Sequence, residues 1–184
     1  MATHDLLPHP AGAPASPMFK LWVNVDRSAA FGRNATLNLF FCVGAPASRF
    51  VIPEAAVAAR RDELWRTTCF EAFLRAEGTD AYVEWNFAPS LDWAAYRFTG
   101  PRIGMAQAEV QSEPYIRVED NLTWWALGAT IAIPADATFD VGLSAVIEEK
   151  DGTKSYWALA HPANGLDAPP DFHDPTCFLA RLPE

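Results

Sequence analysis

Short runs in which apolar and polar residues alternate recur along this chain from Phe19 onward, and clusters of Gly, Pro, Asn and Asp separate them. A strand points its side chains alternately to two faces, so a period of two is typical of strands with one buried face. Many short strands of this kind predict an all-β antiparallel protein, either a two-sheet β-sandwich or a barrel, with few or no helices. Strands are expected at residues 19–25, 36–43, 49–52, 68–76, 81–88, 93–98, 115–119, 122–133, 138–149, 155–160 and 177–182.

Length and composition indicate a single domain. The chain has 184 residues, half of them hydrophobic, and its seven Trp and twelve Phe can supply one large core. Residues 1–17 carry four prolines among small residues and are expected to form an extended lead-in. Residues 18–184 then form one β-sandwich domain. Within it, the Ala-rich stretch 53–65 has no clean apolar stripe and is predicted to be a loop with one or two turns.

The formal net charge of −9 argues against several classes of partner. A negative field repels phosphate backbones and anionic lipid surfaces, so neither nucleic acid nor a membrane is expected to bind. No apolar run reaches the roughly 18 residues that a membrane-spanning helix needs. The three cysteines lie far apart without CxxC spacing, and the N-terminal residues lack the pattern of a secretory signal. The expected location is the cytoplasm, and the oligomeric state stays open.

The stretch AYVEWNFAPSLDWAAYRF, residues 81–98, predicts a β-hairpin, because two alternating runs flank the turn-forming residues PSLD. A four-residue loop would place Ala88 opposite Trp93. In that register Trp85 faces the core, and Glu84 lies opposite Arg97 as a cross-strand pair of opposite charge.

Several segments together resemble a known group of proteins. They are LPHP near the start, LWRTTCFEAFL at 64–74, AYVEWNFAPSLDWAAYRFTG at 81–100, YWALAHP at 156–162 and PPDFHDPTCFLARL at 169–182. In combination they are similar to the DOMON-like proteins related to family 9 carbohydrate-binding modules. This resemblance implies an immunoglobulin-like β-sandwich and a binding function, with sugar or haem as the ligand.

Exposed tryptophans would be the stacking surface of a sugar site. Strand parity places Trp22, Trp93 and Trp124 on the more polar faces of their strands, although loops around a sandwich can still cover such rings. Polar groups would contact the sugar hydroxyls. The candidate ligand-binding residues are therefore Trp22, Trp93, Trp124, Glu71, Glu84, Asn86, Arg97 and His161.

Glu71 lies in a strand that is apolar on both faces, so its carboxylate is expected to be at least partly buried and to need a partner. A structural explanation is a salt bridge with Arg66, Arg75 or Arg97. The functional explanation is an acceptor in a binding cleft. Glu84 has the same two explanations, with Arg97 as its structural partner.

Metal and haem binding rest on fewer residues. Asp171 and Asp174 lie in an oxygen-rich loop that could hold calcium, but Asp before Pro is also ordinary turn chemistry. Met105 with a histidine could ligate haem axially, although the chain has no CxxCH motif. No cofactor and no catalytic residue is expected.

The function that these features favour is non-catalytic, carbohydrate-binding-like recognition. The alternatives are a protein-interaction β-sandwich without a small ligand and a haem-binding DOMON domain. A concave cleft with converging polar groups would favour a small ligand, whereas a flat aromatic surface would favour a protein partner.

Overall fold

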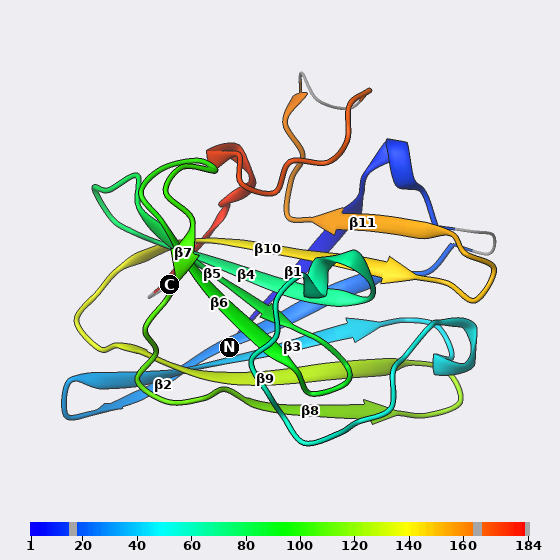
Figure 1. The fold of residues 1–184 in the computed structure, drawn as a ribbon, viewed down its shortest axis with the longest axis horizontal. Helices are drawn as coiled ribbons and strands as arrows, with labels where there is room; N and C mark the ends of the chain where they lie inside the picture. The colour runs from blue at the N-terminus through cyan, green and yellow to red at the C-terminus, as the bar shows by residue number, and fades with distance from the viewer. Residues whose placement is uncertain (15–17, 164–166, 183–184) are drawn as a thin grey trace.

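The computed structural model describes residues 1–14, 18–163 and 167–182. In these parts of the chain the regular structure consists of twelve β-strands and short 3-10 turns (Figure 1). The strands are β1 Ala2–Pro8, β2 Leu21–Phe31, β3 Asn34–Val43, β4 Cys69–Ala76, β5 Tyr82–Phe87, β6 Trp93–Phe98, β7 Ala106–Gln107, β8 Tyr115–Asp120, β9 Trp125–Pro134, β10 Phe139–Glu148, β11 Lys154–Ala158 and β12 Ala180–Leu182. The 3-10 turns are η1 Pro10–Gly12, η2 Ala47–Arg49, η3 Leu64–Arg66 and η5 Pro175–Cys177.

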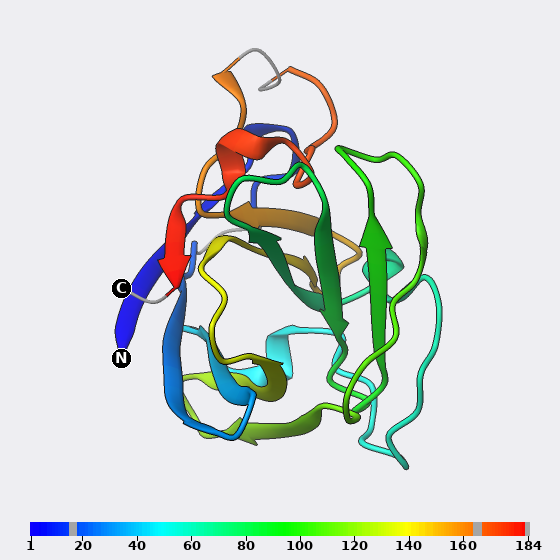
Figure 2. The same cartoon turned by 90° about the vertical axis from the view of Figure 1, so that its left-hand side faces the viewer.

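The named strands pair antiparallel throughout, in the order β7-β6-β5-β4-β10-β11-β1-β2-β3-β9-β8, with β12 paired to β10. The all-β antiparallel prediction is therefore confirmed. The hydrogen-bonded path does not divide into two separate sheets, because β1 joins its two halves. Viewed from the side in Figure 2, this sheet curls around an interior.

The N-terminal segment is part of this sheet. Ala2–Pro8 forms β1, which pairs with β2 through residues 2–6 and with β11 through Leu7 and Pro8. The sequence predicted only an extended lead-in here, and residues 15–17 of that segment lie outside the described residues. The segment is extended, but its backbone is bonded on both sides, so the predicted division at residue 18 does not separate it from the sheet.

The core lies inside the curl, where the apolar faces of the two halves meet. Phe41 on β3 contacts Phe70 on β4, with ring centroids 5.0 Å apart, and Phe70 also packs against Trp125 on β9. Trp157 on β11 is fully buried and donates from Nε1 to Ser155 Oγ at 2.9 Å. Each of these strands therefore has one face committed to the core. In β4, β5, β6 and β10 the opposite face is also covered, which is where the site described below lies.

The predicted hairpin forms, but its register is wrong by one residue. Its loop has five residues, 88–92, because Leu91 adopts a positive φ of 73° and Ala88 N–H donates to Asp92 O. Phe87 therefore pairs with Trp93, Glu84 with Tyr96 and Val83 with Arg97. The predicted Glu84–Arg97 pair does not exist.

Trp85, on the first strand of this hairpin, faces the core, as predicted, and is 5% exposed.

The strand predicted at residues 49–52 does not form. These residues contribute only an isolated bridge from Phe50 to Glu149. Among the described residues, no helix is long and apolar enough to cross a membrane.

Candidate functional site

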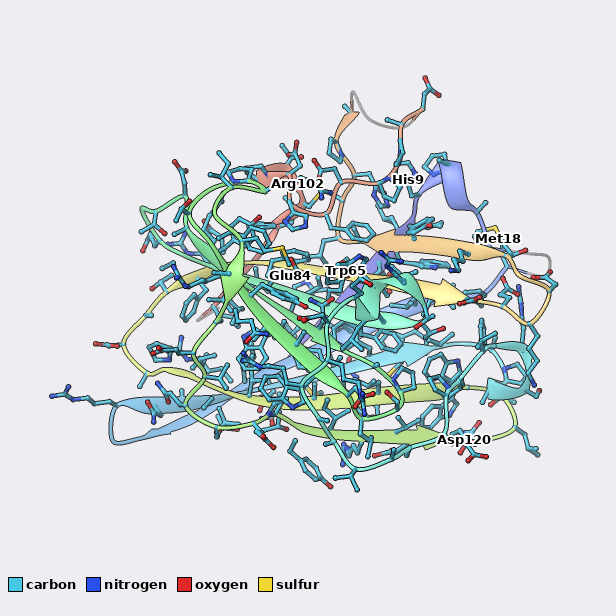
Figure 3. All side chains as sticks on the ribbon, viewed as in Figure 1. His9, Met18, Trp65, Glu84, Arg102 and Asp120 are labelled. Atoms are coloured by element: carbon cyan, nitrogen blue, oxygen red, sulfur yellow. The ribbon has the colours of Figure 1, made fainter. Side chains whose placement is uncertain are left out.

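A cleft of about 350 Å³ opens on the face of β4, β5, β6 and β10 that points away from the core. Three irregular segments border it: the turn at η3, the loop after β6, and the C-terminal segment before β12. Three of the lining residues are labelled in Figure 3: Trp65 on η3, Glu84 on β5 and Arg102 in the loop after β6. The lining residues are Trp65, Glu71, Glu84, Phe98, Arg102, Met105, Val146, Tyr156, Pro170, Phe172 and His173.

Two carboxyl groups lie at the floor of the cleft. Glu71 and Glu84 are 3% and 4% exposed and come from the neighbouring strands β4 and β5. Ser144 Oγ donates to Glu71 Oε2 at 2.5 Å, and Asn86 Nδ2 donates to Glu84 Oε1 at 2.6 Å. Neither carboxyl has a Lys or Arg nitrogen within 4.0 Å among the described residues. A salt bridge with Arg66, Arg75 or Arg97, one of the two explanations open for Glu71 from the sequence, is therefore not the way this charge is accommodated.

Burial instead favours the protonated form of both groups. Desolvation raises the pKa of Glu71 to about 8, and the negative charge of Glu84 adds to this rise. Desolvation also raises the pKa of Glu84, while the amide of Asn86 opposes the rise. The two carboxyls therefore retain a proton at a pH where exposed glutamates are fully ionised.

His173 faces Glu84 across the cleft. The backbone N–H of Arg102 donates to Tyr82 Oη at 3.2 Å, and the Tyr82 hydroxyl also forms a hydrogen bond of 2.6 Å with His173 Nδ1. The other ring nitrogen, Nε2, lies 3.6 Å from Glu84 Oε2. Burial, together with the Arg102 charge, lowers the pKa of His173 to about 4. The imidazole is therefore neutral near pH 7, and its contact with Glu84 is not a salt bridge.

Aromatic rings form the walls above this polar floor. Trp65 stands edge-on to Tyr96, with ring centroids 5.8 Å apart, while Phe98, Tyr156 and Phe172 line other sides of the cleft. Such rings present flat apolar faces to a ligand. The cleft thus combines apolar walls with a few polar groups at one end.

The C-terminal segment is fixed over the sheet by one phenylalanine. The Phe178 ring stacks on Phe73 with centroids 5.7 Å apart and meets Tyr82 edge-on at 5.7 Å. Gly142 on β10 lies directly beneath it, and a Cβ there would be 2.6 Å from Phe178 Cδ1. Because Gly142 has no side chain, the Phe178 ring can pack directly against the backbone of β10.

The two aspartates considered for calcium make protein contacts in this segment. Asp171 Oδ1 accepts from Arg102 Nε at 3.0 Å, and Asp174 Oδ1 accepts from Thr176 N and Oγ1. Within the described residues no group of three or more His, Cys, Asp or Glu side chains is arranged to hold a metal ion. Met105, the methionine named above as a possible axial haem ligand together with a histidine, lines the cleft, and so does His173.

The structure brings three of the predicted site residues together and separates the others from them. Glu71 and Glu84 line the floor of the cleft, and Asn86, which is fully buried and does not line it, is bonded to Glu84. Trp93 is 2% exposed and belongs to the core, because its side of β6 faces inward. Arg97 is exposed next to Phe98 and does not line the cleft.

The remaining predicted residues also lie outside the cleft lining. Trp22 and Trp124 are partly exposed and come from β2 and from the turn before β9, in the other half of the sheet. His161 Nε2 is bonded to Leu7 O at 2.8 Å, and its ring packs against His9. His161 therefore fixes the N-terminal strand near the C-terminal segment, although its ring lies 6.4 Å from that of the lining residue Phe172.

Sequence reasoning missed Trp65, Arg102 and Tyr156 as lining residues. Trp65 and Arg102 lie in irregular segments, where strand parity gives no direction. Tyr156 is on β11, in the segment YWALAHP that contributed to the family resemblance, so this segment was the available signal.

The turn that presents Trp65 is strained at one residue. Glu63 precedes η3 with φ 62°, a left-handed conformation that glycine adopts more easily, and its side chain is exposed. We expect Glu63→Gly to raise the free energy of unfolding by up to about 1 kcal/mol. Chemical denaturation measures the change. Glu54→Gly, at an exposed residue without positive φ, is the matched control and is expected to give no gain. A loss of stability in Glu63→Gly would contradict the prediction.

Comparisons with known proteins give one structural likeness. No protein-family model matches the chain, and no curated protein matches its sequence. The fold is similar to that in the crystal structure of a "putative carbohydrate-binding protein from Bacteroides uniformis ATCC 8492". The TM-score is 0.55 at 14% sequence identity, and the match covers 97% of this chain and 84% of that one. At this identity the comparison supports the all-β fold.

Proposed function

We propose that this protein is a non-catalytic carbohydrate-binding protein that holds a sugar in the cleft above Glu71 and Glu84. The observation that carries the proposal is the combination of aromatic walls and buried polar acceptors in one cavity. A pyranose ring has apolar faces, which pack on aromatic rings, and equatorial hydroxyls, which need acceptors and donors. Trp65 and Tyr156 are suited to the first task, and the two carboxyls to the second.

The size of the cleft also fits a small ligand. Its volume of about 350 Å³ falls within the range of about 300 to 1,000 Å³ that ligand cavities usually have. The site is concave, and its polar groups converge on one end of it. By the criterion given above, this shape favours a small ligand over a protein partner.

The finer proposal is that the chain is a DOMON-like relative of family 9 carbohydrate-binding modules, with an immunoglobulin-like sandwich. Four of the segments that resemble this group supply residues to the same cleft. They contribute Trp65 and Glu71, Glu84 and Phe98, Tyr156, and Pro170, Phe172 and His173. The similar structure from Bacteroides uniformis, whose name refers to carbohydrate binding, supports this proposal at the level of the fold.

A glycan array with the purified protein tests the proposal. We expect binding to a restricted set of glycans and no hydrolysis of them. Trp65→Ala is expected to weaken that binding at least about 10-fold, because it removes one aromatic wall. Trp124→Ala is the matched control, because Trp124 is also partly exposed but does not line the cleft. Absence of binding to every glycan, or equal losses in the two variants, would contradict the proposal.

A further inference from the structure

Each carboxyl at the floor of the cleft has one oxygen free of hydrogen bonds from the described residues. Ser144 occupies Glu71 Oε2, and Asn86 occupies Glu84 Oε1. The other oxygen of Glu84 meets only His173 Nε2, at 3.6 Å, which is too long for a hydrogen bond. Two acceptors from adjacent strands are therefore available to one ligand group in the cleft.

The charged and titratable groups around these oxygens include one permanent cation, Arg102, which lines the cleft. Its positive charge opposes the rise in the pKa of both carboxyls, but its Nε and Nη2 lie 3.0 and 2.8 Å from Asp171 Oδ1, and among the described residues it forms no ion pair with Glu71 or Glu84. His173 is neutral near pH 7, as described above. The remaining groups facing this region are the thiol of Cys69 and the phenols of Tyr82, Tyr96 and Tyr156, and Tyr96 donates to Asp62 Oδ1.

The walls of the cleft also suit a positive charge. Trp65, Phe98, Tyr156 and Phe172 line it, and the negative face of an aromatic ring attracts an ammonium group. A buried carboxylate that gains a cationic partner forms a short, charge-assisted hydrogen bond. The overall charge of −9 further favours the approach of a cation over that of an anion.

We infer that the cleft selects a sugar that carries a free, protonated amine, a hexosamine, and that Glu71 and Glu84 together bind its ammonium group. This inference rests on the proposed sugar-binding function and specifies its ligand. Burial keeps the two carboxyls partly protonated when no ligand is bound. When the ammonium binds, N–H···O⁻ contacts form and a proton held by the carboxyls leaves to solvent, so charge is conserved. A neutral sugar has no group that could replace that proton.

Isothermal titration calorimetry at pH 7 with three related sugars tests the inference. Glucosamine is expected to bind at least about 10-fold more tightly than glucose, and also more tightly than N-acetylglucosamine, whose amide carries no charge. Titrations in phosphate and in MOPS, which differ in ionisation enthalpy and carry no primary amine, are expected to show release of a fraction of a proton with glucosamine only. This second measurement needs no variant, so it does not depend on how a substitution folds.

Substitution of Glu71 then tests whether its carboxyl binds the ammonium group. Glu71→Gln keeps the shape and the Ser144 contact, and it is expected to bring the glucosamine-to-glucose affinity ratio to within about 2-fold. Glu109→Gln, at an exposed glutamate away from the cleft, is expected to keep the wild-type ratio. An unchanged ratio in Glu71→Gln would overturn the inference.

The outcomes also separate this inference from the proposed function. Equal binding of glucose and glucosamine would overturn the inference and leave the sugar site standing. Methylamine binding as tightly as glucosamine would overturn it as well, because the site would then bind an amine without any contribution from the sugar ring. Binding of none of the three sugars, together with a positive glycan array, would likewise reject a hexosamine while retaining carbohydrate binding.

Discussion

Glu71→Gln is expected to stabilise the protein by roughly 4 to 5 kcal/mol at pH 9 and by less than about 1 kcal/mol at pH 5. Glutamine has the shape of the protonated carboxyl and can still accept the Ser144 hydrogen bond. The variant therefore reproduces the acid form of the site at every pH. In the wild-type protein, ionisation of the buried Glu71 carboxyl opposes folding, because burial and the Glu84 charge both disfavour it.

The direction of this pH dependence follows from the raised pKa. A carboxyl whose pKa is higher in the folded than in the unfolded state contributes its full stability below the unfolded pKa, here near 4.5, and loses it as the pH rises to about 8. The difference between variant and wild type should therefore grow between pH 5 and 8 and then level off. Urea denaturation at four pH values measures it, with the exposed Glu109→Gln as a control that shows no such trend. A difference that is constant from pH 5 to 9 would contradict the prediction.

Gly142→Ala is expected to destabilise the protein by about 2 kcal/mol, because the added methyl group would displace Phe178. Phe178→Ala removes a ring that packs against Phe73 and Tyr82, and it is expected to cost about 3 to 4 kcal/mol. Either change should also weaken ligand binding, since the C-terminal segment carries three lining residues, Pro170, Phe172 and His173.

The double variant separates crowding from a general intolerance of the strand. Once Phe178 is alanine, the two closest contacts of the methyl group at residue 142 are gone and the next, Phe73 Cβ at 3.4 Å, is an ordinary van der Waals contact. Gly142 also has no positive φ that would exclude a side chain. Gly142→Ala is then expected to be neutral in this background, which is a coupling energy of about 2 kcal/mol. Thermal denaturation of the four proteins measures it. Equal costs of Gly142→Ala in both backgrounds would show that Phe178 is not the reason for the glycine.

The alternation of apolar and polar residues predicted most strands because each strand has one face in the core. The expected strands at 36–43, 68–76 and 93–98 correspond closely to β3, β4 and β6. Pattern alone failed where backbone geometry decides. Leu91 takes a left-handed conformation that its residue type does not indicate, and the hairpin register moved by one residue as a result. The prolines near the N-terminus suggested an unpaired segment, although β1 contains only one of them, at its end.

The candidate site was predictable only where strand parity applies. Glu71, Glu84 and Asn86 share one face of β4 and β5, and their burial follows from the apolar residues around them. Trp93 was assigned to the wrong face because both faces of β6 are covered, so polarity did not mark the side open to solvent. The position of Trp65 over that face depends on how the loop before β4 folds back. The alternation of apolar and polar residues does not predict the path of a loop.

The pairing of β1 has a consequence for the order of events in folding. Leu7 lies opposite Ala158, so this part of the sheet joins residues that are far apart in the chain. During synthesis, Leu7 leaves the ribosome long before its partner strand exists, and the sheet cannot be completed at this point until β11 has emerged. Contacts of such long sequence separation make folding slow. We therefore expect β1, although it is synthesised first, to form its hydrogen bonds with β11 near the end of folding. Pulsed hydrogen exchange at Leu7 would follow that step.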